Sequence, residues 1–75
     1  MKINIKLMGV LKDKTPADGT LDVPDGATIE EALRVLDISA ETVQVCTVNG
    51  TLERNLQRTL AADDELSVVP PVGGG

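Results

Sequence analysis

The chain has 75 residues, lacks phenylalanine, tyrosine, tryptophan and histidine, and carries a net charge of −5 from seven basic and twelve acidic side chains. The missing aromatic rings argue against nucleic-acid modules that stack bases, and the missing histidine excludes a histidine general base and restricts any metal site to carboxylates. The acidic balance disfavours phosphate backbones and anionic lipids and favours a partner with a basic docking face.

The chain opens with the pattern of a β-hairpin. Residues 2–8 alternate apolar and polar side chains, which is the period-two signature of a half-buried strand. Residues 12–19 contain the proline, aspartate and glycine of a turn, and residues 20–24 form a second short strand. We expect these two strands to pair in antiparallel fashion.

The clearest helix signal follows at Thr28. This threonine and Glu31, three residues later, have the spacing of a capping box. Apolar residues then recur at helical spacing and form one stripe. They are Ile29, Ala32, Leu33 and Leu36. The periodicity is lost after Leu36, which predicts a helix of about ten residues.

Residues 43–54 predict a second hairpin, because Asn49-Gly50 tolerates the positive φ angles of a two-residue turn. Two alternating sets of side chains compete for the inward face of its first strand, and a bulge beside the turn would bury part of both. They are Val43 and Val45 with Leu52, or Cys46 with Val48.

Residues 62–69 predict the last strand, in which Leu66 and Val68 alternate with their neighbours. The single helix must cover one face of a sheet, and the simplest arrangement places the first and last strands side by side in its middle. The sequence therefore predicts an α+β fold, the ubiquitin-like β-grasp, with a mixed sheet and one main helix. We expect a domain over residues 1–69 and a flexible tail over residues 70–75.

The tail is unusual because it ends without side chains. Pro70 and Pro71 have no amide donor, so they end the sheet ladder and favour an extended course. Gly73, Gly74 and Gly75 have no Cβ, so they form a slim thread that carries the terminal carboxylate. Such a thread can enter a channel that is too narrow for any side chain.

A carboxylate must be activated before it reacts as an electrophile, for instance as an acyl-adenylate made from ATP. No glycine-rich phosphate loop precedes a helix in this sequence, so we expect another enzyme to perform that step. The tail therefore predicts a substrate or carrier rather than an enzyme. The alternative is a frayed end without function.

The chain resembles the MoaD/ThiS family of ubiquitin-like sulfur carriers. The residues that carry the resemblance are "VNG" at Val48–Gly50, "ADDELSVVPPV" at Ala62–Val72 and the glycine end. The resemblance implies that a ubiquitin-activating-type enzyme uses ATP to adenylate the terminal glycine, which becomes a thiocarboxylate. A second partner, a biosynthetic enzyme, then accepts the sulfur. The carrier itself binds no permanent cofactor or metal.

Carried over to this chain, the resemblance makes Gly75 the reactive residue and Gly74 the alternative terminus. Gly73, Val72, Pro71 and Pro70 form the threading segment. The family ends in two glycines whereas this chain has three, so either the third is tolerated or one residue is removed first. The opening hairpin lacks the aromatic residue that many molybdopterin-type members carry, whereas the Pro-Pro spacer favours the molybdopterin branch over the thiamine branch.

Docking to partners is predicted for the sheet face that the helix leaves uncovered, with Val69 and Val72. The carboxylates Asp63 and Asp64 are more typical of a solvated turn than of a cation site, and we also consider them as a docking point for a basic patch. Cys46 lies among valines, which favours a small buried hydrophobe over a persulfide acceptor.

A single cysteine forms no internal disulfide, and no apolar run approaches the roughly 20 residues of a membrane span, so we expect a reduced, cytoplasmic protein without nucleic-acid or membrane partners. Two other functions stay open. The chain can be a protein modifier that is joined to lysines through its last glycine, or a binding module with an inert tail. The oligomeric state is not determined by the sequence.

Overall fold

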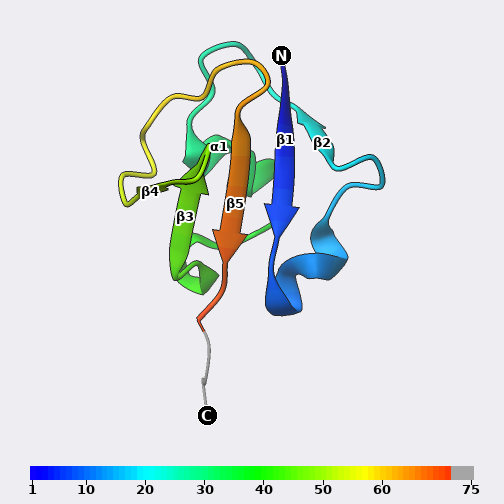
Figure 1. Cartoon of the computed structure of the whole chain (residues 1–75), viewed down its shortest axis with the longest axis vertical. Coiled ribbons are helices and arrows are strands. Elements are labelled where there is room, and N and C mark those ends of the chain that lie inside the picture. The colour runs from blue at the N-terminus through cyan, green and yellow to red at the C-terminus, as the bar shows by residue number, and fades with distance from the viewer. Residues whose placement is uncertain (72–75) are drawn as a thin grey trace.

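The computed structural model of the chain describes residues 1–71, and the predicted threading residues Val72, Gly73, Gly74 and Gly75 lie outside them. Five strands form one mixed sheet in the order β2-β1-β5-β3-β4 (Figure 1). The strands are β1 (Lys2–Leu7), β2 (Thr20–Asp22), β3 (Val45–Val48), β4 (Thr51–Glu53) and β5 (Glu65–Val69). The helices are the 3-10 helices η1 (Gly9–Lys14) and η2 (Ala40–Thr42) and the α-helix α1 (Ile29–Val35).

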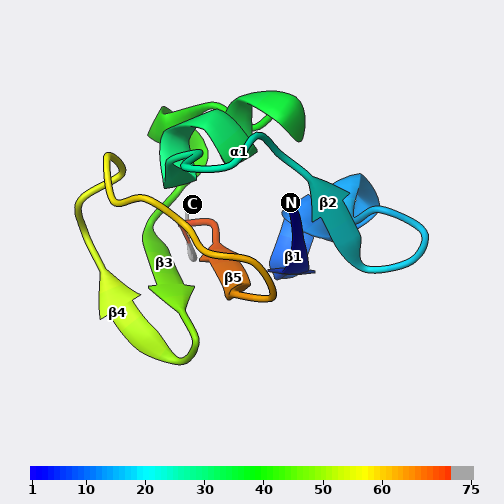
Figure 2. The ribbon, with the colours of Figure 1, turned by 90° about the horizontal axis from the view of Figure 1, so that it is seen from above.

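The predicted fold class is confirmed, because the first and last strands occupy the middle of the sheet. β5 pairs with β1 in parallel and with β3 in antiparallel fashion, while β2 and β4 form the two edges. Helix α1 crosses one face of the sheet only, as the view from above shows (Figure 2). No helix or strand of residues 1–71 covers the other face, which we call the open face.

The core lies between α1 and the sheet. Alternate side chains of β1 and β5 point toward the helix, and the apolar stripe of α1 packs against them. The largest side chains with less than 2% exposure are Ile3, Ile29, Leu33, Leu66 and Val68. Since a chain of this length buries only about 60% of the surface of its unfolded form, these few aliphatic residues supply much of the stability.

Helix α1 begins as predicted and ends early. Thr28 accepts a hydrogen bond from the Glu31 amide at 3.2 Å, and the Glu31 carboxylate accepts one from the Thr28 amide at 3.4 Å, so the capping box is confirmed. The regular helix runs for 7 residues, fewer than predicted, with Leu36 as its C-cap. Asp37 then adopts a positive φ of 61°, and the Ile38 amide donates back to the Leu33 carbonyl at 2.9 Å.

The open question about the second hairpin is settled by its register. Cys46 lies opposite Val68 and Val48 lies opposite Leu66, so both share the inward face with buried β5 residues. Leu52, whose side chain is on the other face, is 50% exposed. No bulge is needed, because residues that lie directly opposite each other in two antiparallel strands share a face of the sheet.

Candidate functional site

The root of the tail is held in the body of the protein from two sides. The Met8 amide donates to the Val68 carbonyl at 3.1 Å, and the Gln44 amide donates to the Val69 carbonyl at 2.8 Å. Pro70 is buried, whereas Pro71 is exposed. The chain therefore leaves the sheet as a continuation of its central strand, from the edge of the molecule that lies below β5 in Figure 1.

Gly9 fits closely against this root. It adopts a φ of +55°, and a Cβ built on it lies 3.2 Å from the Cγ atom of Pro70. A side chain here meets both a strained backbone and a tight contact. Gly9 thus allows η1 to pack beside Pro70, a role that the sequence did not indicate because the segment carries turn-forming residues only further along.

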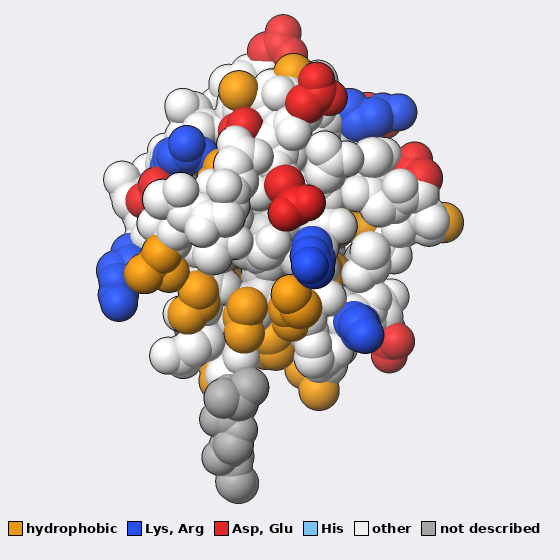
Figure 3. All heavy atoms as spheres, viewed as in Figure 1, with side chains coloured by type: hydrophobic (Ala, Val, Ile, Leu, Met, Phe, Trp, Pro, Cys, Tyr) orange, Lys and Arg blue, Asp and Glu red, His pale blue; other side chains and the backbone are white. Residues whose placement is uncertain are grey.

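A group of apolar side chains borders the tail on the open face, and we call it the tail-root patch. By strand register Val69 lies opposite Val45, and Leu52 lies on the same face beside Thr47. The members of the patch are Met8, Val45, Leu52 and Val69, none of which is fully buried. Figure 3 shows the corresponding hydrophobic band across the lower part of this face. Val69, predicted as a docking residue, is at its centre.

A second apolar surface lies on the other side of the same root. A cavity of about 480 Å³ is bordered by η1, by the segment after α1 and by both prolines. Its apolar lining residues are Val10, Leu11, Ile38, Pro70 and Pro71. Lys14 and Asp37, joined at 3.7 Å, bridge two of the elements that line it. Apolar surface therefore lies on both sides of Pro70.

The motif residues that carry the family resemblance have a structural role. Asn49, at a positive φ of 54°, donates from its side chain to an Asp64 carboxylate oxygen at 2.9 Å and accepts from the Glu65 amide at 2.9 Å. The other Asp64 oxygen accepts from the Ala61 amide at 2.8 Å. These bonds join the turn of the second hairpin to the start of β5.

The carboxylates predicted as docking residues differ in their surroundings. Asp63 is exposed, and its φ is 68°. Hydrogen bonds from the Ala61 amide and then from Asn49 lower the pKa of Asp64 below its usual value of 3.8. Since this pKa is lower in the folded than in the unfolded chain, ionised Asp64 stabilises the fold above the unfolded pKa, and this contribution is lost as the pH falls through the folded pKa.

Replacing Asn49 tests this network. We expect Asn49→Ala to lower the free energy of unfolding by about 1–3 kcal/mol, because two hydrogen bonds are lost and alanine disfavours a positive φ. Asn49→Gly loses the same bonds but tolerates the backbone, so it should lie about 1 kcal/mol closer to the wild type. Urea unfolding at neutral pH measures both differences.

The same variants have a pH signature. In acid, Asp64 is protonated in every chain, so the difference in stability between Asn49→Gly and the wild type should shrink as the pH falls through the lowered pKa of Asp64. A difference that stays constant with pH would show that Asn49 does not act through the ionised carboxylate.

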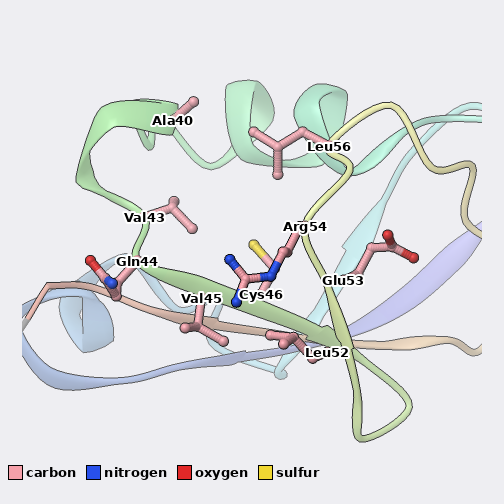
Figure 4. A pocket seen from close by; sticks show the side chains of 9 residues that line it. All are labelled: Ala40, Val43, Gln44, Val45, Cys46, Leu52, Glu53, Arg54 and Leu56. Carbon is pink, nitrogen blue, oxygen red and sulfur yellow. The ribbon is translucent and has the colours of Figure 1, made fainter.

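Cys46 lies at the base of a separate pocket of about 250 Å³ at the β3–β4 edge (Figure 4). The cysteine is free and only 2% exposed, and burial raises the pKa of its thiol. A raised pKa leaves less of the nucleophilic thiolate at neutral pH, which is consistent with the structural interpretation. Residues 1–71 hold no cluster of three potential metal ligands, and none of their helices is long and apolar enough to cross a membrane.

Comparisons with known proteins agree with this geometry. A family model described as the ThiS family matches residues 5–75. SAMP1 from Haloferax volcanii superposes with a TM-score of 0.74 at 26% identity, covering 100% of both chains. Subunit 1 of a putative molybdopterin converting factor from Pyrococcus furiosus gives 0.73 at 20% identity, covering 96% of this chain and 99% of that one.

A third similar structure is a complex of subunits 1 and 2 of the molybdopterin-converting factor from Helicobacter pylori. It gives a TM-score of 0.61 at 21% identity, with 100% of both chains covered. At such identities this structure and the P. furiosus structure support the fold alone. No curated protein matches the chain.

Proposed function

The chain belongs to the ThiS family, and from that membership we propose that it is a sulfur carrier whose terminal glycine is activated by a partner enzyme. The partner transfers AMP from ATP to the carboxylate of Gly75 and releases pyrophosphate. A sulfur nucleophile then displaces AMP, and the product is a C-terminal thiocarboxylate. The carrier supplies only the carboxylate and the thread that presents it.

One observation carries this proposal: the central strand β5 continues directly into the tail. Because β5 is paired on both sides, its direction is fixed by the whole sheet. Pro70 is anchored against η1, so a partner that docks on the tail-root patch finds the start of the tail in a defined place. Positioning of a reacting group to within about 1 Å decides rates by orders of magnitude, which is why a carrier benefits from a rigid root.

The sulfur acceptor that we propose is the pterin precursor of molybdopterin, because the Pro70-Pro71 spacer is typical of that branch. The thiazole of thiamine is the alternative. A second function, conjugation to lysines, is favoured by the likeness to a protein named small archaeal modifier protein 1, at 26% identity. Both functions begin with adenylation and differ in the nucleophile that displaces AMP.

Intact-protein mass spectrometry tests the proposal. The chain is incubated with the adenylating enzyme of its own organism, ATP and a sulfur donor. We expect the free protein to gain the mass difference between one sulfur and one oxygen at its terminus. Higher-mass adducts with other proteins, with no sulfur gain, would favour the modifier instead. A chain that is never adenylated would contradict both.

The same spectra determine which glycine is the reacting terminus. Sulfur on a full-length chain identifies Gly75 as the terminus in use. Loss of one glycine mass before sulfur appears identifies Gly74.

A further inference from the structure

The basic side chains of residues 1–71 fall into two groups. Lys14, Arg34 and Arg58 each lie within 4.0 Å of a carboxylate oxygen. The other four make no such pair with any described residue. They are Lys2, Lys6, Lys12 and Arg54. The places of these four cations on the surface decide which sign of charge an external partner meets there.

Two of these unpaired cations border the tail-root patch. Lys6 lies on the open face of β1, opposite Ser67 of β5. Ser67 precedes Val69 by two residues, so the two side chains are on the same face of the strand. Arg54 directly follows β4 and lines the same pocket as Val45 and Leu52, as Figure 4 shows. The apolar patch therefore has a positive charge on its β1 side and another on its β4 side.

The carboxylates of the strands do not pair with these two cations, although Glu53 lines the same pocket as Arg54. Glu65 begins β5, about 13 Å along the strand from Val69 at 3.3 Å per residue. Glu53 is paired with Arg58 at 3.2 Å, and Asp22 lies opposite Lys2 at the far end of β1. On the helix side of the molecule the acidic residues gather instead, at Glu30 and Glu31 in α1 and at Glu41 in η2. On the open face beside the tail root the local charge thus has the opposite sign to the net charge, whereas Asp37 and Glu41 line the cavity on the other side of the root.

We propose that the tail-root patch binds an apolar protein surface that is bordered by carboxylates, one facing Lys6 and one facing Arg54. This inference rests on the proposed function, since the partner is the adenylating enzyme that receives the tail. It reverses the expectation from the net charge, which favoured a basic docking face. Charges at the border of an interface act mainly on the rate of association and on the choice of partner, while the apolar centre supplies affinity.

Charge reversal tests the inference with a matched control. Lys6→Glu, Arg54→Glu and Arg34→Glu change the net charge equally, but Arg34 lies on α1, away from the open face, and its side chain is 75% exposed. We expect Lys6→Glu and Arg54→Glu each to associate with the adenylating enzyme about threefold more slowly at low salt, and their double variant about tenfold more slowly. Arg34→Glu, which has the same charge change as either single variant, should behave like the wild type. The difference should narrow as salt is raised, because screening weakens exposed charge pairs.

Three measurements distinguish the outcomes. Stopped flow gives the rate of association, thermal unfolding shows that each variant is folded, and pyrophosphate release shows that the wild type is adenylated. Equal slowing by all three substitutions, no slowing, or faster association of the double variant would overturn the inference while the wild type is still adenylated. Absence of pyrophosphate release from the wild type would instead overturn the proposed function. Sedimentation velocity tests whether the tail-root patch binds a second copy of this chain instead. Self-association of the wild type that Lys6→Glu abolishes would assign the patch to that contact.

Discussion

Deleting Gly74 and Gly75 should leave a fully folded protein that its adenylating enzyme cannot use. The truncated chain still ends in a glycine carboxylate, so the reacting group is kept and only its reach changes. Two residues of extended backbone span about 7 Å, and a displacement of this size removes the carboxylate from ATP. Since misplacement by about 1 Å can cost a hundredfold in rate, we expect adenylation to fall more than a hundredfold.

Pyrophosphate release measures this loss, and thermal unfolding should show an unchanged midpoint because the deleted residues lie beyond the anchored Pro70. Gly74→Leu is the matched control: it restores the length but adds a side chain, and we expect it to be equally poor if the thread enters a narrow channel. A truncated chain that is adenylated at the wild-type rate would end the interpretation of the tail as a thread.

Leu66→Ala should have the largest effect on stability. Leu66 is 0% exposed at the centre of the sheet, where it lies opposite Ile5 on one side and Val48 on the other. Truncating a buried leucine costs about 2–5 kcal/mol, and a domain of this size has a free energy of unfolding on the order of 5 kcal/mol. The variant should therefore be partly or wholly unfolded at 25 °C, as circular dichroism in increasing urea would show.

Leu52→Ala provides the comparison for this prediction. The same atoms are removed, but from a side chain that is 50% exposed in the tail-root patch. We expect a loss of stability below about 1 kcal/mol together with weaker binding to the adenylating enzyme. If Leu66→Ala were no less stable than Leu52→Ala, the inward face of β5 would be assigned wrongly.

The sequence predicted those parts of the fold that depend on short-range patterns. The capping box at Thr28 and Glu31 involves residues three positions apart, and the alternation in β1 and β5 follows directly from burial on one side. The family resemblance is likewise confirmed by the match over residues 5–75. By contrast, the face of β3 that points inward is decided by its register with β5, and register is a property of the assembled sheet.

The site was predicted less completely for the same reason. The grouping of Met8 with Val69, and of Lys6 and Arg54 around the patch, joins residues that are distant in sequence. Pro70 was expected in the tail and is buried against Gly9, because η1 occupies a segment where only a turn was expected. The roles of Val72 and the glycines remain predictions because these residues lie outside those described.

The order of the strands has a consequence for biosynthesis. β5 follows the other four strands in the chain, yet it fills the gap between β1 and β3. A nascent chain therefore holds two halves of a sheet with nothing to join them until β5 has been made, and the hydrophobic interior closes only then. A chain that is truncated before β5 therefore lacks the strand that closes the fold together with Val69 of the tail-root patch, so a partner that recognises the finished surface has nothing to bind.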